Sequence, residues 1–188
     1  MKNKFKKGFT ITRSVCFNGR RKVGIDTNIL RRLYDQPYLL GREASRIFNF
    51  NDLIFSHVIC LYEFVRYLKK RENLSKEKAK IKAKEFFKKN NVRLIYPKNC
   101  FVSEQESRSF EEEVNKKLKE EGKDYLDCHS PDSVILLAFK KWGINKIYST
   151  DEAFRIGAQH LGMDGSGLPS FDKLLRDKLR KDKRFSKR

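Results

Sequence analysis

The sequence predicts an α/β fold in three layers, in which helices cover both faces of a central, mostly parallel sheet of four or five strands. Short apolar β-type runs alternate along the chain with longer segments of helical periodicity. Alternation of this kind is typical of a parallel sheet with helical crossovers. The length of 188 residues fits one such domain, and a composition of 39% hydrophobic and 36% charged residues indicates a folded, highly charged chain.

The first two strands are each followed by a helix. Residues 22–25 form a short β-type run, and Asp26-Thr27-Asn28 is a turn-and-cap sequence before apolar residues at helical spacing. A second strand is predicted at 53–55. The following stretch, 58–68, is apolar on most sides, as in a buried helix.

A basic helix follows the second strand and its buried helix. Ser75 is its predicted N-cap, and the helix continues to about Asn90. Ile81, Phe86 and Phe87 are predicted to form its inner face.

The third strand, at 92–96, is stopped by Pro97. Ser103 and Glu106 have the spacing of a capping box, which predicts a charged helix that ends at Gly122.

The last part of the chain contains one more clear strand between two helices. Pro131 opens a helix that Gly143 closes. A fourth strand at 146–148 leads to Asp151 and to a helix through about Leu161. A fifth strand is not evident in residues 163–169. Near the N-terminus, Asn18-Gly19 is a strong hairpin signal that would pair residues 9–17 with the strand ending at Asp26. Because the first strand of such a sheet has neighbours on both sides, we expect this segment to project beyond the sheet instead.

The net charge of +19 is concentrated at the two ends. Residues 1–22 hold eight Lys or Arg and no acid, whereas residues 173–188 hold nine against two acids, so these ends carry 15 of the 19 net charges. Such basic ends indicate a polyanionic partner, and we expect a nucleic acid rather than a membrane surface. We therefore expect a basic extension (1–21), a folded domain (22–172) and a basic tail (173–188).

Several compartments and cofactors are disfavoured. No run approaches the roughly 18 apolar residues of a membrane span, and the basic N-terminus lacks the apolar core of a signal peptide, so we expect a cytoplasmic protein that does not enter membranes. Four widely spaced cysteines form no CxxC pair, and no histidine stands at zinc-ligand spacing. We expect reduced, mostly buried thiols.

Four acids are predicted to meet at one sheet edge. Asp26 and Asp151 directly follow predicted strands, and Asp132 begins a helix that enters from the same edge. Glu63 lies in an apolar helix, where a carboxylate is costly unless it is paired or binds a metal. Each acid alone also fits a helix cap or an ion pair. Together they predict a Mg²⁺ or Mn²⁺ site, because hard oxygen donors favour these ions.

The segments KVGIDTNIL, SHVICLYEF and SPDSVILLAFKKWGINKIYSTDEAF resemble, in this order, the PIN-domain nucleases, a family that includes VapC-type toxins and RNA-processing enzymes. The resemblance spans residues 22–162. It implies a metal-binding catalytic quartet, supporting polar residues, a homodimer and, for a toxin, an antitoxin partner. The implied quartet is Asp26, Glu63, Asp132 and Asp151, and the implied supporting residues are Thr27, Asn28 and Ser149.

The predicted function is a metal-dependent endoribonuclease, either for RNA processing or as a toxin of a toxin-antitoxin pair. A non-catalytic RNA-binding or ribosome-assembly protein and a DNA nuclease are the alternatives. The predicted RNA contacts outside the quartet are basic residues of the lysine-rich helix and of the C-terminal tail: Lys76, Lys80, Lys84, Arg176 and Arg180. Phe5, Phe9 and Phe17 fit base stacking as well as core packing. Of the histidines, His129 stands closest to an acid of the quartet.

If the ends capture RNA, removal of residues 1–20 and 174–188 weakens RNA binding. The salt dependence of binding then flattens by about 0.7 log unit per log unit of salt for each single-strand phosphate that is no longer neutralised. Cleavage at saturating RNA persists, because no predicted metal ligand lies in either end. The check is a salt series of affinities for full-length and trimmed proteins, both carrying Asp26→Asn; equal slopes would contradict the role of the ends.

Overall fold

A computed structural model describes residues 20–35 and 52–167 of the chain, and the structural statements below refer to this part. The N-terminal hairpin predicted at 9–17, the three phenylalanines near it, and the basic tail with Arg176 and Arg180 lie outside the described residues.

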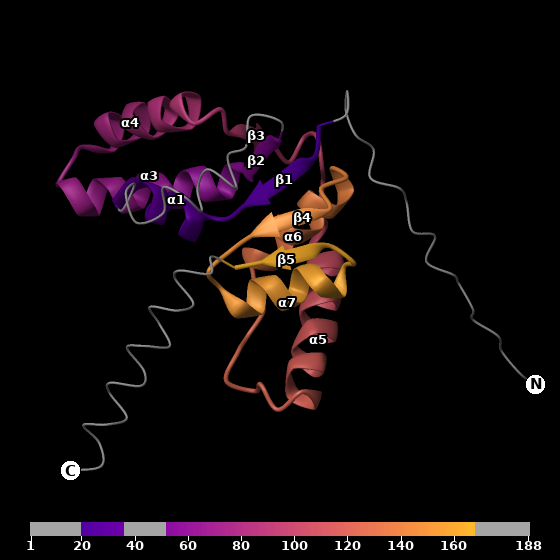
Figure 1. The fold of residues 1–188 in the computed structure, drawn as a ribbon. Coiled ribbons are helices and arrows are strands. Elements are labelled where there is room, and N and C mark those ends of the chain that lie inside the picture. The colour runs from indigo at the N-terminus through magenta and orange to yellow at the C-terminus, as the bar shows by residue number, and fades with distance from the viewer. Residues whose placement is uncertain (1–19, 36–51, 168–188) are drawn as a thin grey trace, which may run out of the picture.

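Five parallel strands form the central sheet in the order β3-β2-β1-β4-β5 (Figure 1). Their bounds are β1 Lys22–Ile25, β2 Leu53–His57, β3 Arg93–Ile95, β4 Lys146–Tyr148 and β5 Asp164–Ser166. Val23 of the central strand β1 lies opposite Ile54 of β2 and Lys146 of β4. The predicted α/β class is confirmed, and every described strand pair is parallel.

Six described helices surround the sheet: α1 Thr27–Asp35, α3 Val58–Glu72, α4 Lys76–Lys89, α5 Glu104–Glu120, α6 Asp132–Lys141 and α7 Glu152–His160. The strand order reverses at β1, so crossovers toward β3 and toward β5 run in opposite directions. With right-handed crossovers, this places the two sets of helices on opposite faces. Contacts agree, because α3 packs against α1 and α4, whereas α5, α6 and α7 pack against one another.

Local signals in the sequence determine several helix ends. Ser103 and Glu106 form the predicted capping box, and the hydroxyl of Ser75 accepts a hydrogen bond from the backbone N–H of Lys78. Gly122 and Gly143, the glycines predicted to end α5 and α6, have φ angles of 69° and 73°. These left-handed conformations favour glycine, so both stop signals act as predicted.

The predicted inner face of α4 is partly wrong. Ile81 is 58% exposed, whereas Ala79 and Ala83 are fully buried and Phe87 is 3% exposed. These three residues repeat at a spacing of four, which places Ile81 on the opposite side of the helix. α4 packs against α3, and two small alanines rather than the more hydrophobic Ile81 lie on its buried face.

The fifth strand has a sequence with little β-propensity, Asp164-Gly165-Ser166. Its position next to β4 depends on Gly165, because a Cβ atom there would lie 2.6 Å from the carbonyl oxygen of Arg155 in α7. Close backbone approach to α7, rather than an apolar pattern, therefore defines this edge of the sheet.

The described cysteines, Cys60, Cys100 and Cys128, are free and buried, as predicted for them. Among the described residues, the structure contains no helix long and apolar enough to span a membrane.

Gly24 in β1 lies directly against the helix layer of α6. A Cβ atom at this position would lie 2.8 Å from the Phe139 ring and 3.1 Å from Ile147. Gly24→Ala is therefore expected to lower the free energy of unfolding by about 1–3 kcal/mol through overpacking. Urea unfolding measures this, with Ser109→Ala on the exposed side of α5 as the control, expected within about 0.5 kcal/mol of wild type. A Gly24→Ala protein of unchanged stability would contradict the close packing.

Candidate active site

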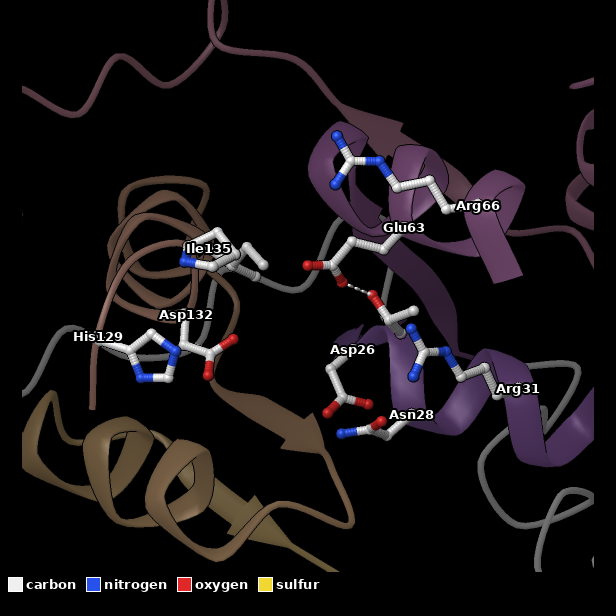
Figure 2. Close-up of a pocket in the computed structure, with 10 residues that line it drawn as sticks. Asp26, Asn28, Arg31, Glu63, Arg66, His129, Asp132 and Ile135 are labelled. Carbon is white, nitrogen blue, oxygen red and sulfur yellow. Dashed lines mark hydrogen bonds between the residues drawn. The ribbon is translucent and has the colours of Figure 1, made fainter. Parts of the chain in front are cut away.

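A polar cavity of about 370 Å³ opens at the edge of the sheet where β1 and β2 end. Figure 2 shows its two walls: α1 and α3 contribute Asn28, Arg31, Glu63 and Arg66 on one side, and Asp132 at the start of α6 stands on the other. Asp26, directly after β1, lies at the base. The carboxyl ends of parallel strands are the usual place for a site in open α/β sheets.

Asp26 is the most buried acid of the cavity, with 5% of its surface exposed. One carboxylate oxygen accepts the backbone N–H of Ile29 at 2.9 Å, and the other accepts the hydroxyl of Ser149. Burial raises the pKa of Asp26 to about 7; both hydrogen bonds lower it, and the charges of Asp132 and Asp151 raise it further. Asp26 therefore caps α1 and also belongs to a group of repelling acids.

Ser149 connects two of the predicted quartet residues. Its buried hydroxyl donates to Asp26 and accepts the backbone N–H of Asp151 at 2.9 Å. Asp151 in turn caps α7, because its Oδ1 accepts the backbone N–H of Phe154 at 3.0 Å. The hydroxyl at position 149 thus links the loop after β4 to the end of β1.

Glu63 on α3 lies on the wall of the cavity opposite Asp132 (Figure 2) and is partly exposed. Its Oε2 accepts a hydrogen bond from the hydroxyl of Thr27, the buried first residue of α1. Within the described chain Glu63 forms no ion pair, so the alternative of a buried Lys or Arg partner is not what the structure contains. Thr27 holds this carboxylate at the cavity.

Asp132 begins α6 on the opposite wall. Its backbone N–H donates to the carbonyl of His129 at 2.8 Å. Burial, followed by repulsion from Asp151 and Glu63, raises its pKa to about 6, and His129 partly offsets this. Three of the predicted quartet thus line the cavity, and Asp151 acts on two of them through its charge.

The donor set suits a hard divalent cation, because every member offers carboxylate oxygen and the buried acids repel one another. The side chains nevertheless do not converge on one point. Within residues 20–35 and 52–167, no three Asp, Glu, His or Cys side chains are grouped closely enough to hold a metal ion. Cation binding would require these side chains to lie closer together than they do here.

Two arginines and one histidine of the cavity were not among the predicted site residues. Arg31 lies four residues after Thr27, and Arg66 lies three residues after Glu63, so each shares a helix face with a predicted site residue. That spacing is the signal that identifies them. His129, noted for its position before Asp132, also lines the cavity, and 64% of its side chain is exposed.

The other two histidines have structural surroundings. His57 is buried, accepts the backbone N–H of Ile59 as the N-cap of α3, and has its pKa lowered to about 4 by burial. The Nε2 atom of His160, the last residue of α7, lies 3.2 Å from a carboxylate oxygen of Glu113 on α5.

The lysines Lys76, Lys80 and Lys84 are exposed along α4 and do not line the cavity, so their contact with RNA stays a prediction.

No protein-family model matches the sequence, and the search of curated proteins gives no match. Solved structures of similar fold include VapBC2 from Rickettsia felis bound to a DNA fragment from their promoter, with a TM-score of 0.51 and 15% identity. That match covers 78% of this chain and 98% of the other. VapBC-1 from nontypeable Haemophilus influenzae is also similar, with a TM-score of 0.51, 12% identity, and coverage of 79% and 98%.

The chain has a PIN-like fold. In this PIN-like fold the reversal of strand order at β1 brings Asp26 next to the loop after β4.

The buried Asp26 makes stability depend on pH. The folded protein keeps the Asp26 proton up to about pH 7, whereas an unfolded aspartate releases it near 3.8, so this group's contribution to stability falls as the pH rises between these values. In metal-free buffer, Asp26→Asn should raise the free energy of unfolding at pH 8 by at most about 4 kcal/mol, with no gain at pH 4.

Urea unfolding in EDTA at pH 4, 6 and 8 tests this expectation, with Asp124→Asn on the exposed surface as the control. The same difference between wild type and Asp26→Asn at every pH would show that Asp26 is not a strained buried acid.

Proposed function

We propose that this chain is a metal-dependent endoribonuclease. The observation that carries the proposal is the placement of three acids from separate segments around one cavity, Asp26, Glu63 and Asp132, with the charge of Asp151 acting on two of them. Four acids are costly to gather without a compensating cation. A cluster retained at that cost fits a catalytic centre better than a structural one.

The chain's own residues would prepare this centre in distinct ways. Ser149 and the backbone of Ile29 orient Asp26, which we assign as the central ligand, and Thr27 orients Glu63. Asp132 and Asp151 complete the donor set for Mg²⁺ or Mn²⁺. A bound ion of this kind lowers the pKa of its water and stabilises charge on the leaving oxygen of a phosphodiester.

RNA is the proposed substrate because the net charge of +19 favours a polyanionic partner. The acids that line the cavity would, however, repel its phosphates. The attraction must come from basic residues outside the quartet. A DNA nuclease uses the same chemistry, so single-stranded DNA is the direct competitor in the assay. If the chain is instead a non-catalytic RNA-binding protein, it should bind RNA without cleaving it.

A protein partner of the antitoxin kind is a further proposal. It is supported by the two solved neighbours, which are named as VapBC assemblies. Such a partner would make the chain the toxin of a pair, whereas a chain that acts alone fits RNA processing. Co-expression with the product of an adjacent gene separates these roles, because only a toxin becomes less harmful to growth.

Cleavage of labelled single-stranded RNA should appear with Mg²⁺ or Mn²⁺ and disappear in EDTA. Asp26→Asn should lower the rate at least about a hundredfold, since the amide keeps the volume of the side chain but not its charge. Asp124→Asn is the matched control and should cleave like wild type. Equal cleavage in EDTA, or a fully active Asp26→Asn enzyme, would contradict the proposed site.

A further inference from the structure

The cavity contains two guanidinium groups that its acids do not neutralise. Arg31 on α1 and Arg66 on α3 stand on the same wall as Glu63 (Figure 2). Within the described part of the chain, neither arginine forms an ion pair. A pair of unneutralised arginines beside an acidic centre therefore needs a separate explanation.

The acids nearest to these arginines in sequence have other partners. Asp35, at the i+4 position from Arg31, accepts the hydroxyl of Tyr67 and lies 3.6 Å from Arg71. Glu63, three residues before Arg66, accepts the hydroxyl of Thr27. Helical spacing would allow both ion pairs, but other contacts occupy the acids and leave both arginines available for an external anion.

Arg31 is also held in place. Its guanidinium carbon lies 5.3 Å from the centre of the Tyr67 ring, a cation-π contact that limits its movement. Its Nε is buried and has no hydrogen-bond partner among the described residues. A buried donor without an acceptor costs about 1–3 kcal/mol, so a small side-chain shift that gives Nε and a terminal nitrogen one anionic acceptor would be favourable.

The chemistry of that acceptor follows from the donors. Guanidinium groups bind phosphate through two parallel hydrogen bonds, a geometry that lysine does not offer. The cavity is open to polymer on the Arg66 side, because Arg66 is exposed whereas Asp26 at the base is buried. A phosphodiester held at the arginines is thus displaced from the one held at the acids.

We propose that Arg31 and Arg66 bind a backbone phosphate of single-stranded RNA next to the phosphodiester that is cut. This rests on the proposed nuclease function and deepens it. The site then selects internal linkages of a polymer, since a dinucleotide with a single phosphate cannot occupy the acids and the arginines together. Arg31 and Arg66 offset at close range the repulsion between the acids and the substrate.

Affinity for a labelled oligouridylate tests this proposal in full-length protein carrying Asp26→Asn to prevent cleavage. Arg31→Gln and Arg66→Gln should each weaken binding about ten- to a hundredfold, the value of one charged hydrogen bond. Arg108→Gln removes the same charge from the exposed face of α5, away from the cavity, and should change affinity less than about threefold. Losses equal to that of Arg108→Gln would overturn the proposal.

A second measurement locates the phosphate and does not depend on the stability of one variant. Oligouridylates with one uncharged methylphosphonate linkage, moved stepwise along the strand, should bind the Asp26→Asn protein weakly at one flanking position. That weak position should disappear in Arg31→Gln and Arg66→Gln, and Arg31→Lys should restore only part of the affinity. Equal sensitivity to the modification in the presence and absence of the arginines would refute the site.

The outcomes also separate this site from the proposed activity. RNA binding that depends on the arginines, in a wild-type protein that does not cleave with either metal, refutes the nuclease and retains the phosphate site. Cleavage by wild type with an unchanged KM in Arg31→Gln and Arg66→Gln refutes the phosphate site and retains the nuclease.

Discussion

The buried carboxylate of Asp26 is the constraint on which the site depends. It lies at the end of the central strand, where the chain turns into α1, and it is held by the backbone of Ile29 and the hydroxyl of Ser149. The second contact joins residues 123 positions apart, so it exists only when β1 and β4 are neighbours in the sheet. The same side chain therefore caps α1, links the end of β1 to the loop after β4 and is repelled by the charges of Asp132 and Asp151.

The four acids are held in two different ways. Asp26 and Asp151 each use one oxygen to cap a helix, which limits their rotation, and the other oxygen of Asp26 accepts the hydroxyl of Ser149. The structural and functional interpretations of these acids are thus compatible. Glu63 and Asp132 are held differently, by a threonine hydroxyl and by the start of α6. Repulsion among these acids raises the pKa of Asp26 and Asp132 beyond the effect of burial, and the resulting strain is what a divalent cation would relieve.

The two arginines of the cavity, Arg31 and Arg66, suggest how an acidic centre in a basic protein can bind RNA. The basic ends and the exposed lysines of α4 would provide long-range attraction that salt screens. Arg31 contacts the Tyr67 ring, and Asp35, four residues after it, has other partners. Arg31 would therefore bind a phosphate of the RNA only at a distance of a few ångströms. Attraction at a distance and positioning at the cavity are therefore assigned to different residues, and only the second depends on how α1 packs against α3.

The order of strands and helices, the capping box at Ser103 and the glycine stops at Gly122 and Gly143 were predictable from sequence, because they depend on interactions between residues close in the chain. The meeting of Asp26, Glu63 and Asp132 at one cavity was predictable only as a pattern of strand ends and helix starts. Tertiary packing decided the rest. It exposed Ile81 in favour of small alanines, formed β5 where Gly165 meets the backbone of α7, and brought Arg31 to the cavity without an acidic partner. These outcomes depend on the shape and charge of side chains far apart in sequence, which local periodicity does not encode.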